Sequence, residues 1–307
     1  MARQTGALQA RVEYAGLSAA VAAMRAVPRE RALELGARLG AAAAAVDRPN
    51  RRIALINLRI AFPELDRSAQ LKIIRDMYRN WGRMLAEWVH MDSLDRSNIE
   101  RYVTYDGQEH WDEAARVSNG RGILVLTAHY GNWELLNAAH AIYGTRITIV
   151  HRPLRNPLMD RDLRAMRSRF GNPSIERKAA GLDMARLLRQ NWMIAVALDL
   201  DVRQGVFVDL FGKPASTSDG LARLAMASGA PVVPCFMVRD GHSAHHRITI
   251  SPALEIEKGR GDRESAIVRN TQRCARAIED AIRGHPDHWN WIHRRWKTRP
   301  PGEPRFY

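Results

Sequence analysis

One stretch of the chain, residues 122–134, decides the fold, and it reads GILVLTAHYGNWE. Its first part is a nearly continuous apolar run, which predicts a buried strand over 122–128. His129 follows at the carboxyl end of that strand, where open α/β sheets gather their chemistry. Asn132 is suited to cap a helix, and Glu134 falls in the first turn of that helix. The stretch therefore predicts a strand–turn–helix unit with a base and a carboxylate at its turn.

His129 and Glu134 stand five positions apart, a spacing that shares no face of a continuous helix but converges across a strand–turn–helix break. A carboxylate that touches one imidazole nitrogen fixes the tautomer and leaves the other nitrogen as a base. We therefore expect Glu134 to hold His129 while His129 deprotonates a hydroxyl that attacks an acyl thioester. The same spacing recurs at His90 and Asp95, after residues that predict a helix end. There the helix dipole explains the histidine, and we expect a structural role for His90.

The whole chain predicts an α/β fold, with a mixed, largely parallel central sheet flanked by helices and an N-terminal helical segment. Helical patterns broken by prolines cover 7–26, 29–46, 50–61 and 67–90. Short apolar runs then alternate with helical periodicity, as in α/β proteins. Strands are predicted at 122–128, 147–150, 193–198, 206–210, 232–238 and 247–256, and helices at 132–143, 157–170, 178–190, 217–228 and 263–283. We expect an N-terminal helical, membrane-associating segment (1–95) and an α/β domain (96–307) that ends in a basic, Trp-rich tail.

The chain is strongly basic, with 47 Lys and Arg against 33 Asp and Glu and a formal net charge of +14. Part of the excess lies in 146–189, and a second basic cluster ends the chain. Such surfaces attract nucleic acid, anionic lipid, phosphorylated head groups or an acidic carrier protein, or they form a solvated basic face. The two cysteines, Cys235 and Cys274, are far apart in sequence, which indicates a reducing compartment without a disulfide framework.

No segment has the pattern of a signal peptide or the length of a membrane-spanning helix. Residues 8–46 instead predict two amphipathic helices. Two interpretations remain open for them. They lie in a membrane interface, or they pack as a hairpin on the main domain.

Other chemistry-bearing residues also follow predicted strands. Arg152 comes after the strand at 147–150, where a guanidinium can hold a phosphate, a carboxylate or an oxyanion, or simply face solvent. Asp199 and Asp201 come after the strand at 193–198, and they suit either a divalent metal or neighbouring basic residues. No dinucleotide glycine pattern, phosphate loop, nucleophile elbow or cysteine zinc spacing is found. The tryptophans of the tail, among arginines, suit lipid head groups or a structural clasp over the sheet.

Five blocks of the sequence resemble the late acyltransferases of lipid A biosynthesis, the lauroyl/myristoyl transferase family of Gram-negative bacteria. They are NLRIAFP at 57–63, HYGNWE at 129–134, RPLRNPL at 152–158, GVFVDLFGKPA at 205–215 and WIHRRWKTRP at 291–300. The blocks run in family order from about residue 50 to the end. The block at 291–300 is the most specific of the five.

The resemblance implies that a fatty acyl chain passes from acyl carrier protein, or CoA, to a hydroxyl of a membrane glycolipid, a lipid A precursor. It implies a peripheral or monotopic enzyme on the cytoplasmic face of the inner membrane, attached to an anionic membrane surface, with no bound cofactor and no nucleic-acid partner. By position His129 is the base and Glu134 its partner. Arg152 and Asp199 match residues important in the family's active site. The residues that we expect to contact substrate are Arg152, Asp199, Asn132 and Arg155.

Two departures from the family pattern leave alternatives open. Many members begin with a spanning helix that this chain lacks, and Leu200 and Arg203 stand where relatives often carry other polar or glycine residues. A branch that acylates mannosylated phosphatidylinositol typically has Asp at the Glu134 position, so Glu134 favours the lipid A branch. Two other classes remain: a metal-dependent glycosyltransferase that uses Asp199 and Asp201 and stops with a chelator, and a nucleic-acid-binding protein whose affinity falls steeply with salt.

Overall fold

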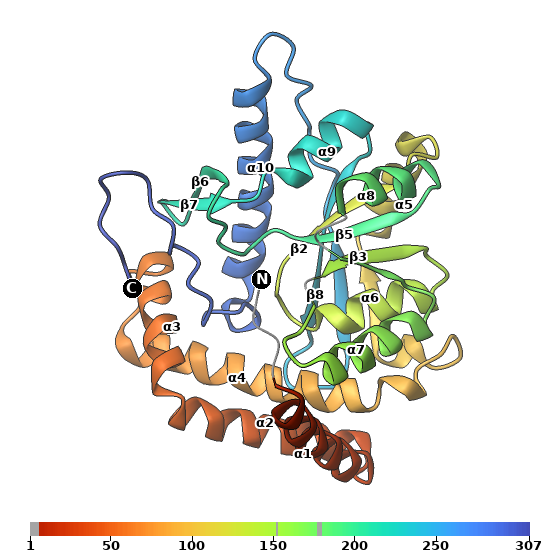
Figure 1. The fold of residues 1–307 in the computed structure, drawn as a ribbon, viewed down its shortest axis with the longest axis vertical. Coiled ribbons are helices and arrows are strands. Elements are labelled where there is room, and N and C mark those ends of the chain that lie inside the picture. Colours follow the sequence, from red (N-terminus) through yellow and green to blue (C-terminus); the bar gives the residue numbers. More distant parts are fainter. Residues whose placement is uncertain (1–5, 152, 177–179) are drawn as a thin grey trace.

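A computed structural model describes residues 6–151, 153–176 and 180–307 of the protein (Figure 1). The helices are α1 (Ala7–Arg25), α2 (Arg29–Val46), α3 (Arg48–Ala61), α4 (Arg67–Val89), α5 (Gln108–Ser118), α6 (Trp133–Ile142), α7 (Pro157–Arg169), α8 (Ala180–Arg189), α9 (Gly220–Ser228) and α10 (Arg263–Gly284), with the 3₁₀ turns η1 (Met91–Ser93), η2 (Ile99–Arg101) and η3 (Pro286–His288). The strands are β1 (Val103–Asp106), β2 (Ile123–Thr127), β3 (Ile147–His151), β4 (Ser174–Glu176), β5 (Met193–Ala197), β6 (Val206–Leu210), β7 (Lys213–Thr217), β8 (Val232–Arg239) and β9 (His246–Ile250).

The strands form one large sheet in the order β1-β9-β8-β2-β5-β3-β4, and β6 pairs with β7 in a separate hairpin. Neighbouring strands of the large sheet are parallel except for β8 and β9, which are antiparallel. The predicted mixed, largely parallel sheet is therefore confirmed. Strand β2 is central, with β5 on one side and β8 on the other.

Alternate side chains of β2 enter two hydrophobic cores, one on each face of the sheet. Leu124 and Leu126 pack in a core with residues of α3, α4, α10 and the C-terminal tail. Ile123 and Val125 pack in the other core, with residues of α5 and α6. Because both faces of β2 are covered, its sequence is apolar from Ile123 to Leu126 instead of alternating.

The N-terminal helices pack against one another and share a core with the sheet. Helices α2 and α4 cross so closely that a Cβ on Gly36 would lie 2.3 Å from the carbonyl oxygen of Gly82. Leu58 of α3 and Met77 of α4 are fully buried in the same core as β2. In Figure 1, α1, α2 and α4 run along one edge of the molecule, and α3 lies near the C-terminus. No helix in the described ranges combines the length and apolar character needed to cross a bilayer.

The predicted N-terminal helices are confirmed, and their caps explain where they begin. The carboxylates of Asp47 and Asp66 accept hydrogen bonds from backbone N–H groups in the first turns of α3 and α4. Apart from the 3₁₀ turns, four of the described elements were not predicted: β1, α5, β4 and β7. The prediction of a strand as far as residue 256 is wrong, because β9 ends at Ile250 and Leu254 pairs with Val232 of β8 only in an isolated bridge.

Candidate active site

His129 and Asp199 follow two neighbouring strands at the same distance from each strand's end. Strand β2 ends at Thr127 and β5 at Ala197, and these two residues are partners in the parallel register. Two residues further along each segment are His129 and Asp199. The register of the sheet therefore brings the imidazole and the carboxylate together at the carboxyl edge of its central strands.

Both oxygens of the Asp199 carboxylate form hydrogen bonds with His129. Imidazole Nδ1 lies 2.9 Å from Oδ1, and the backbone N–H of His129 donates to Oδ2 at 3.0 Å. Trp289 Nε1 donates to the same Oδ2 at 2.9 Å. Because an ionised carboxylate only accepts, Nδ1 carries the hydrogen and Nε2 is the nitrogen with a lone pair. Asp199 is 3% exposed, whereas the His129 side chain is 30% exposed, so the ring is reachable from outside.

The electrostatics of the pair favour its charged forms. Burial opposes a charge on the imidazole, but the attraction and hydrogen bond of Asp199, with a contribution from Glu134, raise the pKa of His129 above its ordinary value of 6.5. Burial likewise opposes charge on Asp199, yet attraction to His129 and the hydrogen bonds lower the pKa of that carboxyl to about 2. Asp199 is therefore an anion throughout the working pH range.

Glu134 was expected to hold the His129 imidazole, and this expectation is wrong. The structure gives Nδ1 of His129 to Asp199, and Glu134 instead forms a bidentate ion pair with Arg167 at 2.5 and 3.0 Å. This pair is buried, with side-chain exposures of 6% for Glu134 and 9% for Arg167. Glu134 still lies near enough to raise the pKa of His129. It therefore acts on His129 through its charge, from the first turn of α6.

Asn132 is a buried cap, as predicted, with a second contact that the sequence did not indicate. Its Oδ1 accepts from the backbone N–H of Leu135, which begins α6. Its Nδ2 donates at 2.8 Å to Glu87 of α4. Arg239, at the end of β8, donates to both oxygens of Glu87 at 2.7 Å. The turn that carries His129 is thus tied to a buried ion pair, which includes a residue of the N-terminal helical segment.

The C-terminal tail also holds this turn, through main-chain bonds. Gly131 N–H donates to the carbonyl of His288 at 2.9 Å, and Asn290 N–H donates to that of His129 at 3.2 Å. Gly131 has φ +58, and a Cβ there would lie 1.9 Å from the Met237 carbonyl oxygen, so this turn requires glycine. The three tail tryptophans are 0–1% exposed, which decides between the two interpretations of the tail. It is a structural clasp, and the lipid head-group interpretation is wrong for Trp289, Trp291 and Trp296.

The other residues singled out in the sequence have varied surroundings. Arg155 is exposed, in the segment before α7. Arg152 lies outside the described residues. Asp201 directs its carboxylate to Thr298, whose N–H and Oγ both donate at 2.9 Å. Asp199 and Asp201 thus take separate partners, and no cluster of three His, Cys, Asp or Glu side chains suited to a metal occurs within the described ranges.

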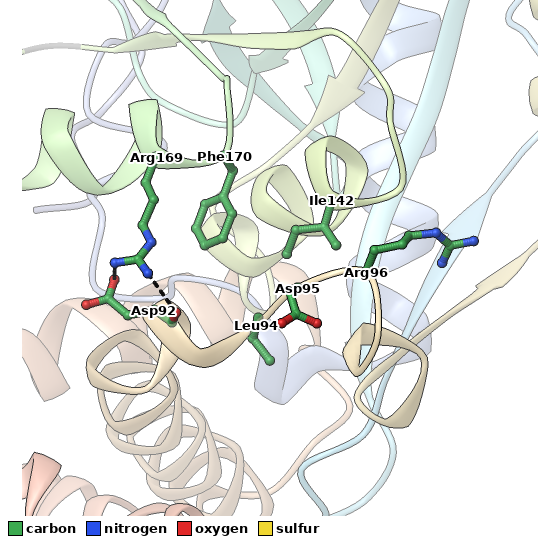
Figure 2. A pocket seen from close by; sticks show the side chains of 7 residues that line it. All are labelled: Asp92, Leu94, Asp95, Arg96, Ile142, Arg169 and Phe170. Carbon is green, nitrogen blue, oxygen red and sulfur yellow. Dashed lines mark hydrogen bonds and ion pairs between the residues drawn. The ribbon is translucent and has the colours of Figure 1, made fainter.

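The second copy of the His129 spacing has the structural setting that the sequence predicts. His90 is the C-terminal cap of α4, and Asp95 accepts from the backbone N–H and hydroxyl of Ser97. A cavity of about 400 Å³ opens beside this segment, next to Ile142, the last residue of α6 (Figure 2). It is lined by Asp92, Leu94, Asp95, Arg96, Ile142, Arg169 and Phe170. Figure 2 shows Arg169 directed at Asp92 across its edge, and His90 is not among its lining residues.

Several residues of the site were missed in the sequence. Trp289 was noted only as part of an aromatic and basic tail, and Glu87, Arg167 and Arg239 were not singled out. Arg239 had a usable signal, since it ends an otherwise apolar run of eight strand residues. Glu87 and Arg167 stand in helices among many other charged residues, where no local pattern distinguishes a buried charge from a solvated one.

Comparisons with known proteins agree with the resemblance. A family model described as bacterial lipid A biosynthesis acyltransferase matches residues 4–298. A lipid A biosynthesis lauroyltransferase of Escherichia coli strain K12 is 29% identical over 280 residues, 89% of this chain and 87% of the relative. A lipid A biosynthesis myristoyltransferase of the same strain is 27% identical over 273 residues, 88% of this chain and 82% of the relative. A palmitoleoyltransferase from that strain is 28% identical over 280 residues, with coverage of 89% and 87%.

Proposed function

The chain belongs to the bacterial lipid A biosynthesis acyltransferase family, and we propose that it moves a fatty acyl chain from acyl carrier protein, or CoA, to a hydroxyl of a lipid A precursor. The observation that carries the proposal is the 2.9 Å contact between His129 Nδ1 and Asp199 Oδ1 at the end of the central strands. This contact leaves Nε2 of the partly exposed imidazole free to act as a base. A base is what a sugar or acyl-chain hydroxyl needs in order to attack a thioester.

The proposed reaction needs only one proton carrier. His129 Nε2 takes the proton of the acceptor hydroxyl as the oxygen bonds to the thioester carbonyl carbon, which gives a tetrahedral oxyanion. When that intermediate collapses, the C–S bond breaks, the ester remains on the acceptor, and the imidazolium returns its proton to the departing thiolate. Asp199 stabilises the imidazolium between these steps and keeps Nε2 facing the reactants. Atoms and protons balance without a cofactor.

The charge on Glu134 supports the same proton transfer from a second direction. Its negative charge favours the imidazolium, and the ion pair with Arg167 fixes where that charge lies. The oxyanion requires a positively charged or N–H donor. Arg152, which lies outside the described residues, is proposed for this role, and Arg155 remains a proposed substrate contact. Asn132 was expected to contact substrate, but it is 1% exposed and its amide is bonded to Glu87 and Leu135, so its proposed contribution is to the shape of the turn.

The donor is proposed to be an acidic carrier protein because of the charge of the surface. Of the basic residues that end the chain, Arg295 is buried and donates to the Ser216 carbonyl, whereas Arg294, Lys297 and Arg305 are exposed. Exposed cations near the site raise the encounter rate with an acidic partner. Comparing turnover with acyl carrier protein and acyl-CoA as donors, at rising salt, tests this choice. Carrier-dependent turnover should fall with salt, since exposed charges are screened.

Attachment to a membrane is proposed to involve the outer faces of α1 and α2. Leu8, Val12 and Val46 are 77%, 66% and 77% exposed, and Ala10 is the one buried residue of α1. Helix α2 packs one face on α4 but leaves Leu39 56% exposed. Apolar side chains of this kind, with the arginines between them, suit the boundary between head groups and acyl chains of an anionic membrane. The proposed location is the cytoplasmic face of the inner membrane.

A single assay tests the proposed function, with a matched histidine as its control. The assay follows transfer of a labelled acyl chain from acyl carrier protein to a lipid A precursor. His129→Ala should lower turnover by at least about 10²-fold, the lower end for general-base catalysis. His90→Ala should keep nearly normal turnover, because His90 ends a helix away from the site. Normal turnover of His129→Ala would refute the assignment. Acyl transfer to a mannosylated phosphatidylinositol, and not to the lipid A precursor, would move the acceptor to the alternative glycolipid.

A further inference from the structure

One side chain of the C-terminal tail, Trp289, contacts the His129–Asp199 pair directly. Trp289 follows η3 and is 1% exposed, and its Nε1–H donates to Asp199 Oδ2 at 2.9 Å. Residues 289 and 199 are separated by 90 positions, so this bond joins the end of the chain to the loop after β5. The same oxygen accepts the His129 backbone N–H at 3.0 Å. Oδ2 is therefore held by two donors, while Oδ1 faces the imidazole.

This arrangement fixes the carboxylate in rotation. A carboxylate that is hydrogen-bonded through one oxygen can still rotate about its Cβ–Cγ bond. Hydrogen bonds to the second oxygen prevent this rotation. The Trp289 bond and the His129 N–H together anchor Oδ2, so Oδ1 stays at 2.9 Å from Nδ1. The backbone on either side is fixed too, since Tyr130 and Trp289 form an antiparallel bridge. A shift of the Trp289 backbone would therefore move the turn that carries His129.

We propose that Trp289 is a positioning residue for acyl transfer, whose indole N–H orients the Asp199 carboxylate toward the His129 imidazole. The inference rests on the proposed function, in which His129 is the base. It gives the buried tail a part in the chemistry as well as in the fold. Trp289 does not reach the reacting atoms itself, because its one polar group is committed to Asp199.

The other tail tryptophans show that this bond is particular to Trp289. Trp291 is equally buried, but its Nε1 donates to the carbonyl of Pro286 at 2.7 Å. Trp296 is also buried, and its Nε1 has no acceptor in the described part of the chain. Trp296 therefore offers a matched control. Replacing it with Phe removes the same volume from the same core without removing a hydrogen bond from Asp199.

Loss of the indole N–H has a signed effect on pH dependence. The N–H neutralises part of the charge on Asp199, so its removal strengthens the attraction between the carboxylate and the imidazolium. The acid limb of kcat/KM, which reports the free enzyme's base, should then move to higher pH. The other charged groups that face the pair in the described residues are Glu134 on α6, Asp201 after β5, and His293 and Arg295 in the tail. The substitution leaves all four in place, so the shift reports the missing donor.

The experiment compares Trp289→Phe with Trp296→Phe in the acyl transfer assay. Trp289→Phe should lower kcat by roughly 10-fold, the rate equivalent of one lost bond to a charged group. KM should stay unchanged, and the acid limb should move to higher pH. Trp296→Phe should show neither effect. Equal losses in both variants with no shift in the acid limb, or wild-type kcat in Trp289→Phe, would overturn the inference.

Two further variants separate a loss of folding, and a failure of the proposed function, from a loss of the Trp289 hydrogen bond. If thermal melting shows that Trp289→Phe does not fold, Trp289 is replaced with 3-benzothienylalanine, which has sulfur in place of the N–H and nearly the same shape. The same losses are then expected. His129→Ala is measured alongside. Activity in that variant would refute the proposed function, whereas an inactive His129→Ala beside an unaffected Trp289 variant would refute the positioning role alone.

Discussion

Replacing Asp199 with Asn should reverse the tautomer of His129, and the hydrogen bonds of the structure say why. The Asp199 Oδ2 position accepts two N–H donors, from the His129 backbone and Trp289, whereas Oδ1 faces a single imidazole nitrogen. An amide has one oxygen and one NH₂ group. Placing the NH₂ at the Oδ2 position would set it against two donors. The oxygen therefore takes that position, and the NH₂ turns toward Nδ1.

This orientation disables the base without removing it. An NH₂ that donates to Nδ1 makes that nitrogen an acceptor, so the hydrogen moves to Nε2, the nitrogen that must take the hydroxyl proton. The same exchange in the serine-protease triad lowers kcat by about 10⁴ through the wrong tautomer. We expect Asp199→Asn to lose between about 10³ and 10⁴ in kcat, which corresponds to about 4–5 kcal/mol of transition-state stabilisation.

The fold should survive the change, so the loss can be read as chemistry. The folded pKa of Asp199 is lowered to about 2 from the ordinary 3.8. A lowered carboxyl pKa contributes stability that is fully present above the unfolded pKa and is lost as the pH falls through about 2. At neutral pH the contribution is about 2 kcal/mol, well below the total stability of a typical domain.

The assay is single-turnover acyl transfer, together with ¹⁵N NMR of the histidine ring nitrogens to identify the tautomer. Asp201→Asn is the matched control, because the Asp201 carboxylate binds Thr298 and not the imidazole. It should keep the wild-type tautomer and nearly wild-type turnover. A Nδ1–H tautomer in Asp199→Asn, with kcat within about 10-fold of wild type, would refute this reasoning. Inactivity of both variants, with wild-type turnover lost in EDTA and restored by a divalent metal, would favour the glycosyltransferase alternative.

Three further outcomes are expected. Because the pKa of His129 is raised, kcat/KM should rise with pH along an acid limb that lies above about pH 6.5, and a limb below that value would contradict the Asp199 contact. Glu134→Gln should lower both turnover and the melting temperature, because it leaves Arg167 buried without a counter-ion, whereas Glu264→Gln, in an exposed pair, should change the melting temperature little. Changing Leu8 and Val12 to Ser should weaken co-sedimentation with anionic vesicles more than Leu182→Ser on α8, and equal effects would remove α1 from the membrane contact.

Elements were predicted well from the sequence where the residues that determine them lie close together in the chain. Helices α1 to α4 were predicted well because the prolines at their boundaries, such as Pro28 and Pro49, act within one turn. Strand β7 was missed because its hairpin turn is Phe211-Gly212, with φ of +53 and +71. Such a turn normally carries Asn or Gly at its first position, and Phe gives no turn signal there.

The partner of His129 was predicted from proximity in the chain, and the sheet register provides a different one. Glu134 is five residues away, and the strand–turn–helix break made its approach to the ring reasonable. Asp199 is 70 residues away, and only the pairing of Thr127 with Ala197 brings it to the imidazole. Two polar residues that each directly follow a predicted strand were a usable signal. It requires knowing that the two strands are neighbours, which the chain order does not reveal.

The carboxylates of Asp199 and Glu134 have different roles because they contact different groups. Asp199 is surrounded by N–H donors and touches the ring, so it sets the tautomer and the orientation of His129. Glu134 is bound to a buried guanidinium, so its own position is fixed and its charge reaches His129 without competing for Nδ1. If Glu134 took Nδ1 in place of Asp199, Arg167 would be left as an uncompensated buried cation, at a cost of about 3–5 kcal/mol. The ion pair with Arg167 therefore helps to keep the imidazole with Asp199.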